Sequence, residues 1–112
     1  MNPLVVAWLQ LIAGVLFEVA GTYAMKRADG FAKPGWAVVM LAAYVVCFTL
    51  VTLSLRTLPL SVAYAVWAGV GTAIVGILGM LLFGEPVTGL KVVGLVLVVA
   101  GVVALNIGGV TR

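Results

Sequence analysis

Charged and metal-binding residues are scarce in this chain. Only 8% of its 112 residues are charged, histidine is absent, and Cys47 is the sole cysteine. A single cysteine excludes an internal disulfide, and the lack of a Cys/His cluster argues against a structural zinc or haem site. There is no glycine-rich phosphate-binding loop for ATP, and a net charge of +3 is too small for a nucleic-acid surface. We therefore expect no metal, no cofactor and no nucleic-acid partner.

Long apolar runs make up most of the sequence. Hydrophobic residues account for 65% of the chain, and a soluble domain of this size could not hide so much apolar surface. Four runs reach the roughly 20 residues needed to cross a bilayer, near Leu4–Met25, Trp36–Leu55, Ser61–Phe83 and Val92–Val110. The pattern predicts an all-α membrane protein in which residues 1–112 form a single four-helix transmembrane domain.

One acidic residue lies inside an apolar run. The chain has three acidic residues, and while Asp29 and Glu85 fall between runs, Glu18 lies within the first. An acidic side chain at the centre of a membrane helix costs roughly 2.5–3.5 kcal/mol, so such a group usually faces protein or water and has a function. We expect Glu18 to bind a proton or a cation.

Small residues surround Glu18 on its own helical face. Gly14, Gly21 and Thr22 lie three or four positions away, which places them beside the carboxylate on a helix. They would let another helix or a ligand approach closely, or they could simply serve helix packing. We interpret them as residues that line the site.

Aromatic residues in the second and third runs are candidates to contact a bound cation. Tyr64 and Trp67 are three residues apart and share a face, and Tyr44 and Phe48 are a similar pair four residues apart. An aromatic face next to a carboxylate suits an organic cation, because each ring adds a cation–π contact of roughly 0.5–2 kcal/mol. Tyr44 is the better candidate of the second pair, because its hydroxyl needs a partner at membrane depth.

Glycines mark two further positions. Gly69 and Gly71 follow Trp67 and could form a bend or hinge in the third run. In the fourth run Gly94, Val98 and Gly101 fall on one stripe, as expected of a helix that associates with another through small residues. We expect this stripe to mediate dimerisation.

The basic residues give little preference for one membrane orientation. Four spans put two basic side chains on one side and four on the other: Arg56 and Arg112 against Lys26, Arg27, Lys33 and Lys91. Strongly oriented proteins usually show a larger excess of Lys and Arg on the cytoplasmic side. The charges are compatible both with a fixed orientation and with insertion in two directions.

Together these motifs resemble the small multidrug resistance transporters over essentially the whole chain. The matching segments are Phe17–Thr22, Met25-Lys26, Asp29–Phe31, Leu58-Pro59, Ala63–Gly71 and the pair Gly94 and Gly101. The resemblance implies a proton-coupled exporter of cationic compounds in the cell membrane of a bacterium, not an enzyme. It also implies an antiparallel dimer, formed either by two copies of this chain or with a paired homologue.

The resemblance assigns roles to individual residues. Glu18 matches the membrane-embedded glutamate that binds protons or the cation. Tyr64 and Trp67 match the aromatic pair of the binding site, and Tyr44 matches the tyrosine of the second helix. Gly94 and Gly101 match the dimerisation helix.

Within the resemblance, the residue at position 21 favours the multidrug, quaternary-ammonium subtype. Guanidinium exporters typically carry tryptophan there, and Gly21 would leave more room beside Glu18. Ala68 and Thr49 depart from residues common in the family, which affects the expected substrate range. The alternatives are a guanidinium-type exporter and a non-transporting membrane subunit, such as a ring proteolipid with one buried carboxylate per chain.

Overall fold

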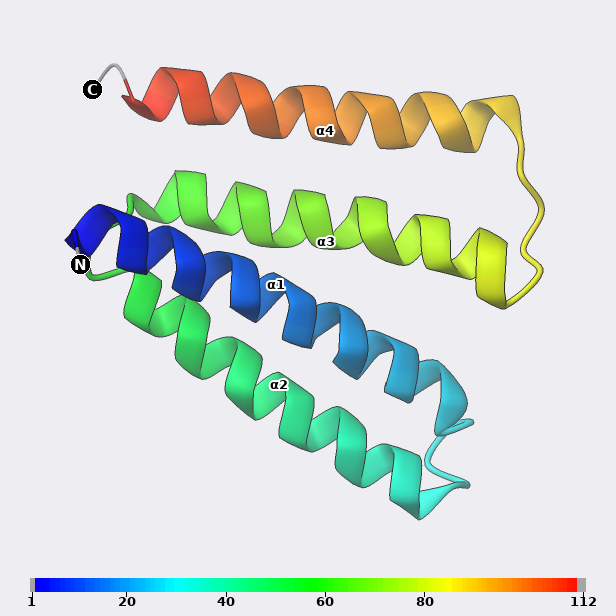
Figure 1. Cartoon of the computed structure of the whole chain (residues 1–112). Coiled ribbons are helices and arrows are strands. Elements are labelled where there is room, and N and C mark those ends of the chain that lie inside the picture. The colour runs from blue at the N-terminus through cyan, green and yellow to red at the C-terminus, as the bar shows by residue number, and fades with distance from the viewer. Residues whose placement is uncertain (1, 111–112) are drawn as a thin grey trace. The chain divides into compact units, whose positions relative to one another are not determined.

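The computed structural model describes residues 2–110 and contains four α-helices and no strand within them (Figure 1). These are α1 (Pro3–Arg27), α2 (Pro34–Ser54), α3 (Leu60–Leu82) and α4 (Gly89–Val110). Each is long and apolar enough to cross a membrane. The predicted all-α architecture with four membrane-length helices is confirmed. Arg112, which entered the charge comparison, lies outside the described residues.

The helices begin and end up to three residues away from the predicted limits. The fourth helix begins at Gly89 rather than Val92, because the Thr88 hydroxyl accepts a hydrogen bond of 3.1 Å from the backbone N–H of Lys91. The first begins at Pro3, where the Asn2 side chain accepts a hydrogen bond from the N–H of Leu4. Capping residues set a helix end, whereas hydropathy marks only the apolar centre.

The chain forms two compact units that divide after Leu58. One unit contains α1 and α2, and the other contains α3 and α4. Within each unit the two helices run side by side in opposite directions (Figure 1). That the four helices make one domain stays a prediction.

In the first unit, α1 and α2 approach each other closely at Gly14. A methyl group added there would lie 2.9 Å from Cγ2 of Val51 and 3.4 Å from the carbonyl oxygen of Cys47. Leu11 and Cys47 are fully buried in this unit. A small residue at position 14 therefore allows the two backbones to come together, as small residues do in membrane helix pairs.

In the second unit, α3 supplies the small residues and α4 supplies the larger ones. A methyl group at Gly69 would overlap the side chain of Val102, and one at Gly76 would lie 3.1 Å from Leu95. Within this unit the remaining surface of α4 is uncovered, and Leu97 is 66% exposed. This face is therefore available to meet lipid or another helix.

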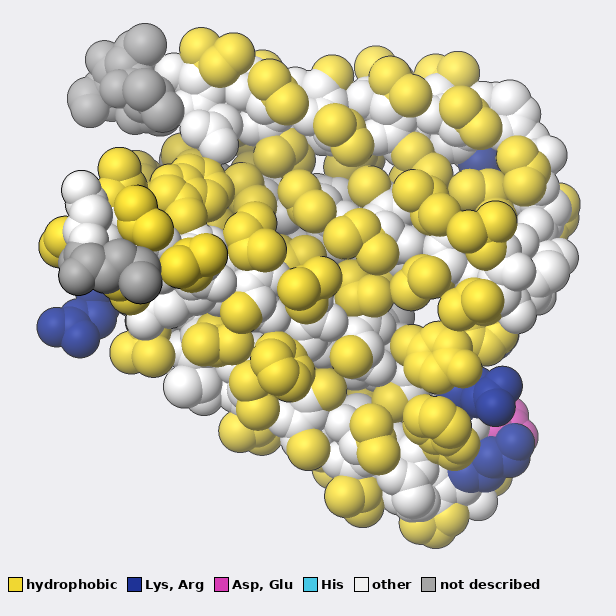
Figure 2. All heavy atoms as spheres, viewed as in Figure 1, with side chains coloured by type: hydrophobic (Ala, Val, Ile, Leu, Met, Phe, Trp, Pro, Cys, Tyr) yellow, Lys and Arg dark blue, Asp and Glu magenta, His cyan; other side chains and the backbone are white. Residues whose placement is uncertain are grey.

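The surface of the molecule is suited to a bilayer. Figure 2 shows hydrophobic side chains over the length of the helices, with Lys and Arg side chains gathered towards helix ends. A chain that spans a membrane needs apolar side chains along its helices and charged ones near the water on either side.

Candidate cation and proton site

Glu18 is the only acidic residue within the described helices, and it lies in the middle of α1. Its side chain is partly buried, and its Oε2 atom is buried with no hydrogen-bond partner among residues 2–110. Burial of an unpaired carboxylate oxygen is costly, and the cost falls when the group takes up a proton or pairs with a cation. The environment of Glu18 is therefore suited to exchange between these two ligands.

Gly21, one turn after Glu18, contacts the aromatic ring of Tyr44 from α2. A methyl group added to Gly21 would lie 2.8 Å from both Cδ1 and Cε1 of that ring. Gly21 was expected to leave open room beside Glu18, but Tyr44 occupies the space over this glycine. The physical reason is that a glycine lets a side chain of the facing helix come directly against the backbone.

Thr22 fixes the other end of Tyr44. The Thr22 Oγ1 and Tyr44 hydroxyl atoms are 2.7 Å apart and share a hydrogen bond. The Tyr44 ring also lies near the Phe48 ring, with centroids 6.2 Å apart. Gly21, Thr22, Tyr44 and Phe48 thus form one group of contacts across α1 and α2, next to Glu18 along α1. Gly14 lies on the other side of Glu18 and packs against Val51 instead.

Tyr64 and Trp67 form an aromatic pair on α3. Their ring centroids are 5.6 Å apart, and their planes meet at 75°. Tyr64 is 58% exposed and Trp67 is partly buried, so at least one ring face remains accessible for a cation–π contact. The two residues belong to the second unit, and their position next to Glu18 stays a prediction.

The glycines predicted to form a hinge in α3 and a dimerisation stripe in α4 lie in different environments. Gly69 contacts α4, Gly71 is buried, and α3 continues as a helix through both. A methyl group at Gly94 or Gly101 would meet nothing within 4 Å, whereas Val98 lies close to Gly69. The predicted stripe is therefore divided, because Val98 already packs within the chain. The hinge and dimerisation roles stay predictions.

Two features of the structure were missed by the sequence analysis. The first is the hydrogen bond between Thr22 and Tyr44, which joins residues 22 positions apart. The second is a pocket at the opposite end of the first unit that includes Gln10. Gln10 gave a signal, since it is a polar amide within an apolar run. Among the described residues no group of His, Cys, Asp and Glu side chains could hold a metal ion.

A family model and several bacterial proteins are similar to most of this chain. Residues 6–98 match the family model described as Small Multidrug Resistance protein. Multidrug resistance protein EbrB of Bacillus subtilis is 43% identical over 99 residues, which cover 88% of this chain and 84% of EbrB. Quaternary ammonium compound-resistance protein QacE of Escherichia coli is 38% identical over 100 residues, which cover 89% and 91%. Nicotine metabolites export pump subunit NepB of Paenarthrobacter nicotinovorans is 40% identical over 101 residues, which cover 90% of this chain and 61% of NepB.

Proposed function

The chain belongs to the Small Multidrug Resistance family of membrane efflux transporters, which are not enzymes, and on that premise we propose that it exchanges protons for lipophilic organic cations. It is a multi-pass membrane protein with bacterial relatives. The substrates we propose are quaternary ammonium and related delocalised cations. The proton gradient across the cell membrane would supply the energy, so no cofactor is required.

The proposal rests on one observation, which is the location of the Glu18 carboxylate. It is the only acidic group within the four described spans, and its Oε2 atom is buried without a hydrogen-bond partner among residues 2–110. An ionised carboxylate there attracts a cation, and a protonated carboxyl releases it. Because both ligands use the same group, coupling requires no second site.

The aromatic side chains would select which cations bind. Tyr64 and Trp67 offer rings that can stack on a flat or bulky cation, each worth roughly 0.5–2 kcal/mol. Tyr44 and Phe48 add aromatic surface on α2, and Thr22 orients Tyr44 through its hydroxyl. A site built from one carboxylate and several rings favours organic cations over small hydrated ions, because rings compensate poorly for the loss of water around a small ion.

The active form that we propose is an antiparallel homodimer. The open face of α4 with Gly94 and Gly101 supports it, because small residues let membrane helices associate closely. The near balance of basic residues supports insertion in both directions. Two opposed copies would make the inward-open and outward-open states equivalent by symmetry, so neither would be a costly conformer. The two Glu18 carboxyls would then titrate as a coupled pair.

The residue at position 21 supports the quaternary-ammonium subtype. Gly21 admits the Tyr44 ring next to Glu18, and a tryptophan at that position could not coexist with Tyr44 in this arrangement. The name of QacE, a quaternary ammonium compound-resistance protein, agrees with this choice. NepB is named as a pump subunit, which supports a heterodimer with a paired homologue as the second candidate assembly.

The decisive experiment measures binding of tetraphenylphosphonium to the purified full-length protein between about pH 5 and pH 9. We expect the affinity of the wild type to increase as the pH rises, because protons and the cation compete for Glu18. Glu18→Gln should bind no tetraphenylphosphonium at any pH. Glu85→Gln makes the same chemical change outside the spans and should behave like the wild type.

Each outcome of that experiment has a distinct meaning. Binding retained by Glu18→Gln would show that Glu18 is not the cation site. Binding of guanidinium with no binding of tetraphenylphosphonium by the folded wild type would assign the chain to the guanidinium subtype. Binding that appears only after a paired homologue is added would establish the heterodimer.

A further inference from the structure

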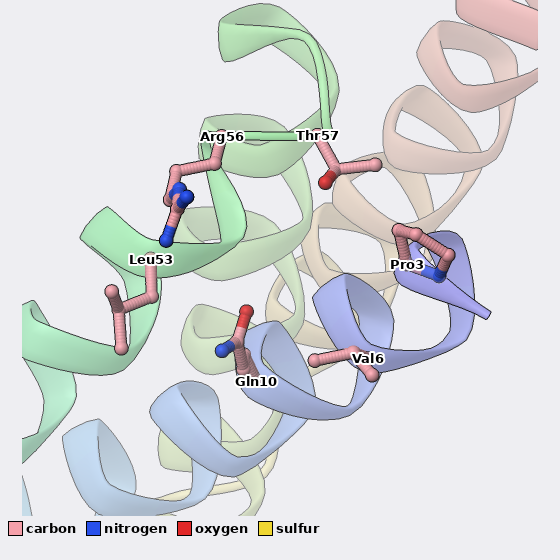
Figure 3. A pocket seen from close by; sticks show the side chains of 6 residues that line it. All are labelled: Pro3, Val6, Gln10, Leu53, Arg56 and Thr57. Atoms are coloured by element: carbon pink, nitrogen blue, oxygen red, sulfur yellow. The ribbon is translucent and has the colours of Figure 1, made fainter. Parts of the chain in front are cut away.

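A polar pocket lies at the end of the first unit, away from the middle of α1 that carries Glu18. It has a volume of about 300 Å³. Its lining residues come from the first turns of α1 and from the end of α2 with the following turn: Pro3, Val6, Gln10, Leu53, Arg56 and Thr57 (Figure 3). All six residues belong to the first unit.

The lining has a polar part and an apolar part. In Figure 3 the Arg56 guanidinium and the Gln10 amide point toward one another across the space between the two helices. With the Thr57 hydroxyl they provide several hydrogen-bond donors, and a guanidinium binds phosphate through two parallel hydrogen bonds. Pro3 and Val6 contribute apolar surface next to these donors. This combination fits a molecule that carries a phosphate group and a hydrocarbon portion.

Arg56 makes no ion pair within residues 2–110, so none of the described carboxylates neutralises its positive charge. In α1 the nearest carboxylate along the helix is that of Glu18, eight residues after Gln10, which corresponds to about 12 Å of helix. The start of α1 carries partial positive charge and the end of α2 carries partial negative charge, so the two helix ends offset one another. The attraction of the pocket for an anion therefore comes from the Arg56 guanidinium.

The position of the pocket indicates where that anion comes from. Both α1 and α2 are long enough to cross the bilayer, so the beginning of α1 and the end of α2 reach the membrane surface. Phospholipid phosphates lie at that depth, with their acyl chains directed toward the bilayer centre. A lipid bound here would place its phosphate at Arg56 and its hydrocarbon portion along the apolar helices.

We propose that this pocket is a binding site for the phosphate group of an anionic phospholipid. Arg56 supplies the charge, Gln10 and Thr57 supply further donors, and Pro3, Val6 and Leu53 contact the hydrocarbon portion. The site is separate from the cation site, and the proposal does not depend on the transported substrate.

The test is native mass spectrometry of the purified full-length protein with dioleoylphosphatidylglycerol as the probe. We expect Arg56→Gln to weaken binding of this lipid by about tenfold or more, as expected for the loss of charge-assisted hydrogen bonds. Gln10→Leu should weaken it by a smaller factor, because it removes a neutral donor. The matched control is Lys33→Gln, which removes an exposed positive charge outside the pocket and should leave the affinity unchanged.

Two further arms identify the ligand. Dioleoylphosphatidylcholine, which has no net charge, should bind more weakly than the anionic lipid. Inorganic phosphate at the same concentration should not displace the anionic lipid, because it lacks the hydrocarbon portion. The circular dichroism spectrum and thermal unfolding of Arg56→Gln should match the wild type and would demonstrate that the variant is folded.

The proposal is overturned if Arg56→Gln binds the anionic lipid as well as the wild type does. It is also overturned if Lys33→Gln loses as much affinity, because the attraction would then be a general effect of surface charge. Displacement by inorganic phosphate would show that the pocket binds a free anion rather than a lipid.

Discussion

Replacement of Gly21 by alanine tests the contact that joins α1 to α2 next to Glu18. The added methyl group would lie 2.8 Å from two carbon atoms of the Tyr44 ring, closer than side chains normally approach. The ring cannot stay in place, and its movement would break the hydrogen bond of 2.7 Å between Tyr44 and Thr22. We therefore expect Gly21→Ala to weaken the packing of α1 against α2.

The expected loss of stability can be estimated from three contributions. Overpacking of a close contact costs about 1–3 kcal/mol, and loss of the hydrogen bond costs about 0.5–1.5 kcal/mol. Alanine recovers up to about 1 kcal/mol, because it forms helix more readily than glycine. With about 1 kcal/mol recovered, the net destabilisation is about 0.5–3.5 kcal/mol, which raises the population of the open helix pair about 2- to 400-fold.

The chain carries its own reporter for this measurement. Cys47 is the only cysteine, and its side chain is fully buried in the first unit. A maleimide reagent can react with the thiol only when the helix pair opens, so the labelling rate follows the population of the open state. We expect Gly21→Ala to accelerate labelling of Cys47 by the factor given above.

Two controls make the result specific to the Gly21–Tyr44 contact. Gly35→Ala adds a methyl group to a helical glycine with nothing within 4 Å and should leave the labelling rate nearly unchanged. In a Tyr44→Leu background the ring is absent, so Gly21→Ala should have a much smaller effect there. Equal labelling rates for Gly21→Ala and Gly35→Ala, or an undiminished effect in the Tyr44→Leu background, would refute the reasoning.

Three further predictions concern the second unit. Gly69→Ala should lower the stability of the α3–α4 pair by about 1–3 kcal/mol, because the new methyl group meets α4. Gly94→Ala should instead lower only the dimer fraction, which cross-linking measures. Equal unfolding curves for the two variants would contradict this prediction. Trp67→Leu removes a ring that we expect to contact the cation, so it should weaken tetraphenylphosphonium binding about 2- to 30-fold in calorimetry. Unchanged affinity would exclude Trp67 from the site. Thr88→Val removes the hydrogen bond that caps α4 and should cost about 1 kcal/mol in unfolding monitored by circular dichroism; an unshifted transition would show that the cap contributes nothing.

The four spans could be predicted from the sequence, and Glu18 could be identified from it as the one carboxylate inside a span. A segment inside a bilayer must satisfy its backbone hydrogen bonds internally, so a run of about 20 apolar residues is almost always a helix. A carboxylate within such a run is conspicuous for the same reason, since its cost in the membrane requires a compensating role. Both inferences depend only on local composition, and neither requires knowledge of which helix packs against which.

The contacts between helices required the tertiary structure. In the sequence, Gly21 indicates open space, and only the fold shows that Tyr44 fills it. Likewise Gly94, Val98 and Gly101 form one stripe in the sequence, but Val98 packs near Gly69 while the two glycines remain open. In a soluble protein the apolar face of a helix identifies its buried side. In these helices nearly every side is apolar, so periodicity does not distinguish the side that meets a neighbouring helix from the side that meets lipid.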